Sequence, residues 1–489
     1  LERLLKYIEN DYVDRIDTDS LVGEVIEDIV SRLDPHSIYI PSHQRQIIAE
    51  NMQGNFYGIG VSFLMSKDSV AIVRVLEGGP SEAAGVQGGD RILIANEDTL
   101  FNKNYSTDKI MQTLKGKPGT SVDLTIYRKS EDKMIKFEMK RGKVPIPSVD
   151  SYYLINKTLG YLKINRFSQT TFDEFDRALS NLLSMGMEKL ILDLRDNPGG
   201  YLHPAIQISN TFLRKDQTIV ITKSNNGEKA KSLAEGDGNF QEGNLVVLVN
   251  GQSASASEIV AGAIQDNDRG WIIGRRTFGK GLVQQQMPLG GGDAIRLTIA
   301  KYFTPTGRSI QKPYNGNRED YYQDLNNRYH RGEMADVEKI SIADSLAFKT
   351  PGGRTVFGGG GIMPDFYIQN SNSEKEEWNS LILDSNVMSN FVFEELDSYR
   401  NKFRGFEIED LLKGKFEDIL PWHDLFLSYC AKKEFEVTIQ EQETLKAVKA
   451  YLGLQLFGEN TFNQIKNQDD LFLETAINNI DSLTQKIND

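Results

Sequence analysis

The feature that most restricts the fold of this 489-residue chain is a repeated strand–turn–helix order between about residues 144 and 368. The apolar runs 190–194 and 245–250 have the length and composition of buried strands, and a turn and a helical pattern follow each of them. Strands that alternate with helices form a largely parallel sheet that the helices cover. We therefore predict an α/β layer for this part of the chain.

The remainder of the chain differs in composition from this layer, and its length exceeds what one hydrophobic core supports. Short β-rich runs between glycine turns precede the layer. Beyond residue 371, only 4 of the 42 glycines and 1 of the 14 prolines remain, and helical periodicity dominates. We expect a multidomain α/β protein with an N-terminal helical segment (1–55), a β-rich domain (56–142), an α/β core (143–370) and a C-terminal helical region (371–489).

Charge and cysteine content exclude several classes of function. The formal net charge of −13 argues against nucleic acid or anionic lipid as the main partner. Cys430 is the single cysteine, which excludes an internal disulfide and a multi-cysteine metal site. The sequence has no HExxH pattern and no apolar run long enough to cross a membrane. We expect neither a metal ion nor an organic cofactor.

A serine-rich segment, Asn250-Gly251-Gln252-Ser253-Ala254-Ser255-Ala256-Ser257-Glu258, lies between an apolar strand and a helix. A serine on such a turn presents its hydroxyl at the edge of the sheet, beside the free N–H groups of the helix's first turn. Those N–H groups are able to stabilise an oxyanion. A serine-rich helix cap without chemistry explains the same pattern, so this segment alone leaves both interpretations open.

A lysine between glycines follows in Phe278-Gly279-Lys280-Gly281, with Gln284 four positions beyond the lysine. Burial lowers the pKa of a lysine because desolvation disfavours the ammonium, and the neutral amine is then a base. Flanking glycines let the backbone approach closely, and a glutamine amide is able to hold the amine in position. A surface lysine in a glycine turn is the alternative.

Two other chemistries fit parts of the same region less well. Gly274 to Lys280 matches the nucleotide-binding pattern G-x-x-x-x-G-K, but Gly281 stands where magnesium binding needs Ser or Thr. The following residues also predict a strand, whereas phosphate binding needs a helix there. A Ser–His–Asp triad with His203 and Asp193 is possible, and we consider it less favourable than the Ser–Lys pair.

Eight motifs, taken together and in order, resemble the carboxyl-terminal processing (tail-specific) peptidases over roughly residues 1–370. They are Leu33-Asp34-Pro35-His36-Ser37, Tyr57 to Val61, Gly79 to Val86, Leu192 to Gly200, Ser253 to Glu258, Thr277 to Gln284, Thr304 to Ile310 and Gly361 to Asp365. The resemblance implies a ClpP/crotonase-like α/β protease core with an inserted PDZ domain. It also implies an extracytoplasmic location, in a bacterial periplasm or envelope, after removal of a signal or anchor.

The resemblance assigns roles to individual residues of this chain. Ser255 matches the family nucleophile, since Ala-Ser-Glu follows it, and Lys280 matches the family's general base. Gln284 matches the glutamine that orients the lysine. The oxyanion donors are expected to be the N–H of Ala256 and one from either Gly199 or Gly200.

The same resemblance places a carboxylate-binding loop at Tyr57-Gly58-Ile59-Gly60-Val61. Its N–H groups would hold the free carboxyl end of a protein or peptide substrate, which would add to the domain's edge as a strand. A glycine-containing strand entry is the structural alternative. If the dyad were silent, the chain would be a PDZ scaffold that binds carboxyl tails.

Two parts of the chain depart from the family pattern. They are an insertion at about 313–357 and the helical region 371–489. The sequence does not choose among regulation of access, a homo-oligomer contact and an adaptor contact for these parts, and surface packing is the simpler interpretation.

Overall fold

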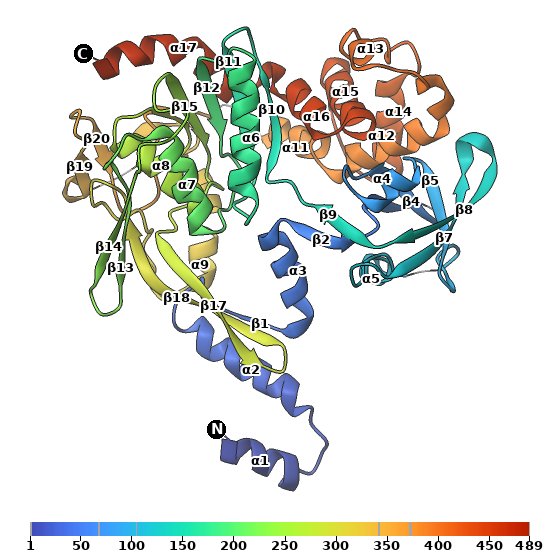
Figure 1. Ribbon diagram of the computed structural model, residues 1–489, viewed down its shortest axis with the longest axis horizontal. Coiled ribbons are helices and arrows are strands. Elements are labelled where there is room, and N and C mark those ends of the chain that lie inside the picture. Colours follow the sequence, from blue (N-terminus) through green and yellow to red (C-terminus); the bar gives the residue numbers. More distant parts are fainter. Residues whose placement is uncertain (1, 67–68, 104, 341–342, 371–373, 489) are drawn as a thin grey trace. The chain divides into compact units, whose positions relative to one another are not determined.

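The computed structural model describes residues 2–66, 69–103, 105–340, 343–370 and 374–488. The chain divides into two compact units (Figure 1). The first comprises Leu1–Gln53, Leu154–Asn370 and Thr475–Asp489, and the second comprises Gly54–Tyr153 and Ser371–Glu474. In the described part of the chain, no helix has both the length and the apolar character needed to cross a membrane.

A parallel sheet forms the centre of the first unit. Its parallel strands, in spatial order, are β11 (Leu159–Ile164), β12 (Lys189–Asp193), β15 (Asn244–Val249), β16 (Trp271–Gly274) and β21 (Phe366–Tyr367). The connecting helices include α6 (Thr171–Ser184), α7 (Leu202–Phe212) and α8 (Ala256–Asp266). The apolar residues at the centre of β12 and β15 are inaccessible to solvent, as a sheet covered on both faces requires. The predicted α/β layer is confirmed.

The start of α6 differs by one residue from the start that its sequence pattern predicts. The pattern Thr171-Phe172-Asp173-Glu174 predicts a capping box with Thr171 before the helix, but α6 begins at Thr171 and Thr170 occupies the cap position. The Thr171 hydroxyl accepts from Ser168 N at 2.7 Å, while Thr170 Oγ1 donates to Glu174 at 2.7 Å. Because two threonines are adjacent, the sequence alone does not fix which of them precedes α6. The contact between Ser168 and Thr171 places Thr171 inside the helix.

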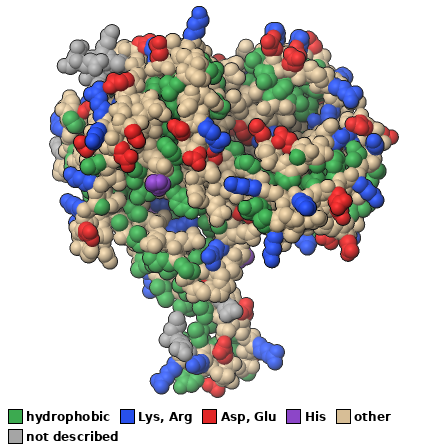
Figure 2. Space-filling model, in the orientation of Figure 1, with side chains coloured by type: hydrophobic (Ala, Val, Ile, Leu, Met, Phe, Trp, Pro, Cys, Tyr) green, Lys and Arg blue, Asp and Glu red, His purple; other side chains and the backbone are tan. Residues whose placement is uncertain are grey.

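A second, antiparallel sheet in the first unit carries part of the candidate site. It contains β1 (Ile38–Ile40), β13 (Thr218–Ser224), β14 (Lys229–Leu233), β17 (Leu282–Gly290) and β18 (Asp293–Phe303). The N-terminal segment adds α1 (Glu2–Asp11), α2 (Thr18–Ser31) and α3 (Ser42–Gln53). Figure 2 shows hydrophobic side chains gathered over β17, β18 and α2, where Ile29, Leu289 and Ile299 are exposed.

The insertion after β18 folds onto the first unit. Within the described residues it contains α9 (Arg318–Tyr322), α10 (Asp324–His330) and the hairpin β19 (Ala347–Lys349) to β20 (Thr355–Phe357). Residues 341–342 of the insertion lie outside the described part of the chain.

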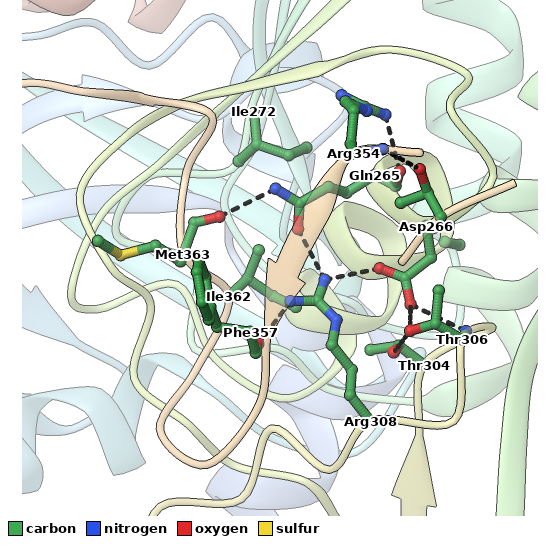
Figure 3. A network of polar contacts seen from close by, with 12 residues as sticks. Gln265, Asp266, Ile272, Thr304, Thr306, Arg308, Arg354, Phe357, Ile362 and Met363 are labelled. Carbon is green, nitrogen blue, oxygen red and sulfur yellow. Dashed lines mark hydrogen bonds and ion pairs between the residues drawn. The ribbon is translucent and has the colours of Figure 1, made fainter. Parts of the chain in front are cut away.

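A buried polar network joins the end of α8 to the loop that leads into the insertion (Figure 3). Arg308 donates to Asp266 at 2.7 Å and to Gln265 at 2.6 Å, and neither the Arg308 nor the Asp266 side chain is exposed. Asp266 also accepts from Thr306 Oγ1 at 2.6 Å. These contacts fix the far end of the helix that begins after Ser255.

The second unit contains a β-rich domain with an antiparallel sheet. Its main strands, in spatial order, are β3 (Val61–Ser66), β4 (Ser69–Val75), β5 (Asp90–Ala95), β7 (Ser121–Arg128) and β8 (Lys133–Lys140). The domain also holds β2 (Asn55–Gly58), β9 (Gly142–Pro145), α4 (Pro80–Ala84) and α5 (Thr107–Leu114). Ile110 and Leu114 of α5 complete the core. Strand β3 lies at an edge of this sheet, so within the described residues one side of its backbone has no neighbouring strand.

Helices of the C-terminal region share this second unit. They include α11 (Glu374–Leu383), α12 (Asn386–Ser398), α14 (Trp422–Lys432) and α15 (Glu441–Phe457), packed around an aromatic core. Asp397 of α12 accepts from Arg91 at 2.6 Å and from Lys129 at 2.8 Å on the β-rich domain. Residues 371–373, where the sequence places the start of this region, lie outside the described part of the chain. The four domain boundaries stay predictions.

Candidate active site

Ser255 stands at the junction of β15 and α8, as its sequence context predicts. It is the cap residue of α8, with φ 55° and ψ −111°. Positive φ is rare for a residue with a Cβ atom and costs on the order of 1–3 kcal/mol, so the surrounding structure holds this turn against strain. Such strain gathers at functional sites, and here it falls on the serine that the sequence selects.

Glu258 joins the serine turn to the lysine turn. Its carboxylate accepts from the backbone N–H of Ser255 at 2.9 Å, Gly279 at 2.7 Å and Lys280 at 2.9 Å, and from Thr277 Oγ1 at 2.6 Å. The side chain is inaccessible to solvent, and this burial raises the pKa of the carboxyl above its usual value. One buried group therefore sets the spacing of the two loops.

Lys280 lies in the glycine turn that the sequence predicts. Gly279 has φ 89°, which strains any residue with a side chain, and a Cβ atom there would lie only 3.0 Å from Gly361 N. Burial of the ammonium, followed by the positive charge of Arg296, lowers the pKa of Lys280 to about 8. A substantial fraction of the amine is therefore neutral near that pH and able to accept a proton.

Gln284 holds the Lys280 amine from strand β17. Lys280 Nζ donates to Gln284 Oε1 at 2.9 Å, and Gln284 Nε2 donates to the backbone oxygen of His36 at 2.6 Å. A backbone carbonyl only accepts hydrogen bonds, so the amide nitrogen faces His36 and the amide oxygen faces the lysine. The N-terminal segment thus fixes the orientation of Gln284.

The His36 side chain connects this arrangement to the insertion. Its Nε2 lies 2.8 Å from the hydroxyl of Tyr321 on α9, and that hydroxyl accepts from Gln311 Nε2 at 2.9 Å. Gln311 Oε1 in turn accepts from the N–H of Gly281 at 2.9 Å. Burial, followed by the nearby charge of Lys280, lowers the pKa of His36 to about 3, so its ring is neutral.

Tyr302 bridges the two candidate catalytic residues through their backbones. Its hydroxyl shares its single proton between the carbonyl oxygens of Ser255 at 3.0 Å and Lys280 at 2.7 Å. The side chain is buried. Sequence reasoning missed Tyr302, Tyr321 and the His36 carbonyl, although two of these residues lie in or next to motifs that carry the family resemblance.

The candidate oxyanion donors lie beside Ser255. A Cβ atom on Gly199 would come within 2.8 Å of both Ser255 Cβ and Ala256 N, which shows how closely the two loops approach. The Gly199 N–H donates to Asn197 Oδ1 at 2.9 Å. Among the described residues, no acceptor is bonded to the N–H of Gly200 or of Ala256. These two groups are therefore the ones available to an oxyanion.

A groove of about 620 Å³ brings the predicted residues together. Its lining includes Ser255, Lys280, Gln284, Gly199, Gly200 and Ala256, together with apolar side chains such as Met52 and Ile259. Among the described residues, Gln284 Oε1 is the one hydrogen-bond acceptor of Lys280 Nζ. Direct contact between Lys280 Nζ and Ser255 Oγ is not made in this state.

The structure does not assemble the alternative triad. The Asp193 carboxylate is buried and accepts from Arg195 and from the Tyr161 hydroxyl, whereas His203 is exposed on α7. No hydrogen bond joins His203 to Asp193 within the described residues. The nucleotide-binding alternative also lacks its helix, because β17 follows Lys280. In the described ranges, no group of three or more His, Cys, Asp or Glu side chains is placed to hold a metal ion.

The segment Tyr57-Gly58-Ile59-Gly60-Val61 runs from the end of β2 to the first residue of β3 in the β-rich domain. The carbonyl of Ile59 accepts from Ser81 N at 2.8 Å and that of Gly60 from Leu76 N at 2.9 Å, which fixes the loop. Within the part of the chain that the structure describes, no acceptor is bonded to the N–H of Ile59 or Gly60. The loop therefore offers free donors next to the edge strand β3.

Comparison with known proteins assigns two parts of the chain to known families. A model of peptidase family S41 matches residues 158–322, and a PDZ-domain model matches residues 58–149. The carboxy-terminal processing protease CtpB of Bacillus subtilis is 33% identical over 317 residues, which are 64% of this chain and 65% of that protein. The carboxy-terminal-processing protease of Bartonella bacilliformis is 34% identical over 316 residues, 63% of this chain and 71% of that protein.

A solved structure, the photosystem II D1 C-terminal processing protease, is similar with 23% identity and a TM-score of 0.39, covering 75% of this chain and 86% of that one. The fold and the sequence matches together define a peptidase core combined with a PDZ domain. The chain belongs to the carboxy-terminal processing proteases of peptidase family S41. The predicted family resemblance and fold class are confirmed. The matched part of the chain spans slightly less than two thirds of the length of the Bacillus subtilis relative.

Proposed function

We propose that this protein is a serine endopeptidase in which Ser255 is the nucleophile and Lys280 the general base. The observation that carries the proposal is the environment of Lys280: a buried amine with a pKa of about 8, held by Gln284, in the same groove as a strained serine. Neutral lysine is a suitable base for a serine hydroxyl because its pKa then lies near the working pH.

In the first half of the reaction, substrate fills the groove and the Lys280 amine approaches Ser255 Oγ. The amine accepts the hydroxyl proton while Oγ forms a bond to the scissile carbonyl carbon. The N–H groups of Gly200 and Ala256 hold the resulting oxyanion, and losing one such donor typically costs about 2.7–4 kcal/mol of barrier. The Lys280 ammonium then gives its proton to the departing amine as the C–N bond breaks.

In the second half, Lys280 is neutral again and accepts a proton from water. The hydroxide oxygen bonds to the acyl carbon, the same N–H groups hold the second oxyanion, and the C–Oγ bond breaks. Lys280 returns the proton to Ser255 Oγ. The products are a new carboxyl end and a restored dyad, and no step calls for a cofactor.

We further propose that the PDZ domain binds the carboxyl end of a partly unfolded substrate. The free N–H groups of Ile59 and Gly60 suit a carboxylate, and the open edge of β3 suits an added strand. An extracytoplasmic location in a bacterial envelope remains a proposal by family analogy. A contact of residues 371–489 with a second copy or an adaptor stays a prediction.

The test is cleavage of an unfolded protein by wild type, Ser255→Ala and Lys280→Ala, with products identified by mass spectrometry. Wild type is expected to cut, and both variants, shown to be folded by thermal melting, are expected to be inactive. Lys301→Ala is the control, because Lys301 is an exposed lysine on β18. Retained cutting by Ser255→Ala would show that the nucleophile is another residue, and an inert wild type would favour the PDZ scaffold.

A further inference from the structure

The register of the β17–β18 hairpin places Arg296 in the groove. Gln286 of β17 lies directly opposite Arg296 of β18, and Gln284 is two positions away on the same strand. Residues opposite one another, or two apart on one strand, point to the same face of a sheet. Arg296 therefore shares a face with the residue that holds Lys280, and all of these side chains line the groove.

Several other largely buried arginines of the first unit have partners of a kind that Arg296 lacks. Four of these are paired with a carboxylate: Arg276 with Glu333, Arg308 with Asp266, Arg328 with Asp324 and Arg354 with Asp268. Arg269 has no carboxylate partner but donates to the backbone oxygens of Phe212 and Phe240. Within the described ranges, no hydrogen bond or ion pair joins the Arg296 guanidinium to another residue. A partly desolvated charge without a partner is costly, so a ligand is the expected partner.

The charged side chains that line the groove are all positive. Its charged residues are Arg45, Lys280 and Arg296, and it contains no Asp or Glu. This cationic groove belongs to a chain whose formal net charge is −13. The Debye length at physiological ionic strength is about 8 Å, so the overall negative charge is largely screened at the groove while a contact with Arg296 is not.

We propose that Arg296 is a specificity-determining residue that binds a carboxylate of the substrate near the bond cut at Ser255. The inference rests on the proposed peptidase function and names a feature of its substrate. A guanidinium binds a carboxylate through two parallel N–H···O bonds, which gives both strength and orientation. The carboxylate belongs either to an acidic side chain of the substrate or to its free carboxyl end. Substrates that differ in only one of these groups distinguish the two sources.

Arg296 also acts on the general base. Its positive charge contributes, after burial, to the lowered pKa of Lys280. A carboxylate bound at Arg296 offsets that charge, so the Lys280 pKa in the complex lies higher with an acidic substrate than with a neutral one. With the acidic substrate, kcat is therefore expected to begin to rise at a higher pH than with the neutral substrate.

The experiment compares peptides that differ only in charge, cut by wild type, Arg296→Gln and Arg296→Lys. Glutamate is compared with glutamine at each position around the scissile bond, and each peptide has a free or an amidated carboxyl end. Wild type should favour one carboxylate by about tenfold in kcat/KM, chiefly through KM, as one charge-assisted contact allows. Arg296→Gln should abolish this ratio, and Arg296→Lys should retain part of it.

The control is Lys301→Gln, which removes one positive charge from an exposed position of the same strand and should keep the wild-type ratio. A preference for a glutamate at one position identifies an acidic side chain as the ligand, and a preference for the free end identifies the terminal carboxylate. Equal cutting of all peptides by wild type, or an unchanged ratio in folded Arg296→Gln, overturns the Arg296 proposal and leaves the peptidase function standing. A wild type that cuts none of the peptides overturns the peptidase proposal instead.

Discussion

At the scale of single residues, the candidate site depends on groups that touch no substrate. Glu258 accepts four hydrogen bonds from the serine and lysine turns, and Tyr302 bridges the carbonyls of the same two residues. Both side chains are buried, so their hydrogen bonds are protected from competition with water. The distance between Ser255 and Lys280 is thereby set by packing and by two polar anchors.

Replacement of Tyr302 by phenylalanine tests one of these anchors. Tyr302→Phe keeps the ring and removes the hydroxyl that joins Ser255 O to Lys280 O. The lost hydrogen bond is worth about 1 kcal/mol. Because its loss misaligns Ser255 and Lys280 in the transition state, kcat/KM should fall about fivefold. The measurement is steady-state cleavage of a peptide alongside thermal melting.

The matched control is Tyr367→Phe, which removes the hydrogen bond from the Tyr367 hydroxyl to Glu333 O elsewhere in the first unit. It should lower the melting temperature by a similar amount while kcat/KM stays at the wild-type value. Equal kcat/KM values for the two variants would mean that Tyr302 serves stability alone.

At the scale of elements, α8 carries Ser255 before its first residue and Asp266 as its last. The Arg308–Asp266 contact holds that last turn against the loop after β18 (Figure 3). Tyr321 of the adjoining insertion accepts from Gln311, which in turn accepts from the N–H of Gly281 in the Lys280 turn. Both ends of the helix are therefore tied to segments that position the lysine. Substitutions far from Ser255 should act on the site through this helix.

Asp266→Ala is expected to destabilise the protein by about 3–5 kcal/mol, because it leaves the buried Arg308 without its carboxylate. The measurement is the free energy of unfolding in urea or, if unfolding is not reversible, the melting temperature. Glu242→Ala is the control: its partner Arg214 is largely exposed, and such a pair contributes about 0–1 kcal/mol. A loss for Asp266→Ala as small as that of the control would contradict the role given to this network.

Local features of the sequence predict part of the fold and of the candidate site, whereas features that depend on tertiary contacts are not predictable from it. The strands β12 and β15, the turn at Ser255 and the turn at Lys280 were predictable because apolar runs and glycine positions are local features. Arg296 was not, since it reaches the groove through the register of a hairpin. Tyr321 was not either, because the insertion docks by tertiary contacts that no local pattern encodes.

At the scale of the whole molecule, the chain combines two compact units with different contents. The first holds the groove with Ser255 and Lys280, and the second holds the PDZ domain together with helices of the C-terminal region. The acidic net charge of the chain contrasts with the cationic groove. Both Lys280 as the proposed base and the proposed carboxylate contact at Arg296 depend on charges in that groove. The dependence of activity on pH therefore tests both proposals.

The most direct measurement is kcat/KM of wild type against pH, with Ser255→Ala as the blank. Lys280 must be neutral to accept the serine proton, so kcat/KM should rise with pH through a single limb near pH 8, where its lowered pKa lies. Arg296→Gln should move that limb to higher pH, because Arg296 contributes to lowering the pKa of Lys280. A limb near the ordinary histidine pKa of about 6.5, unmoved by the Arg296 substitution, would contradict a lysine base and return attention to His203.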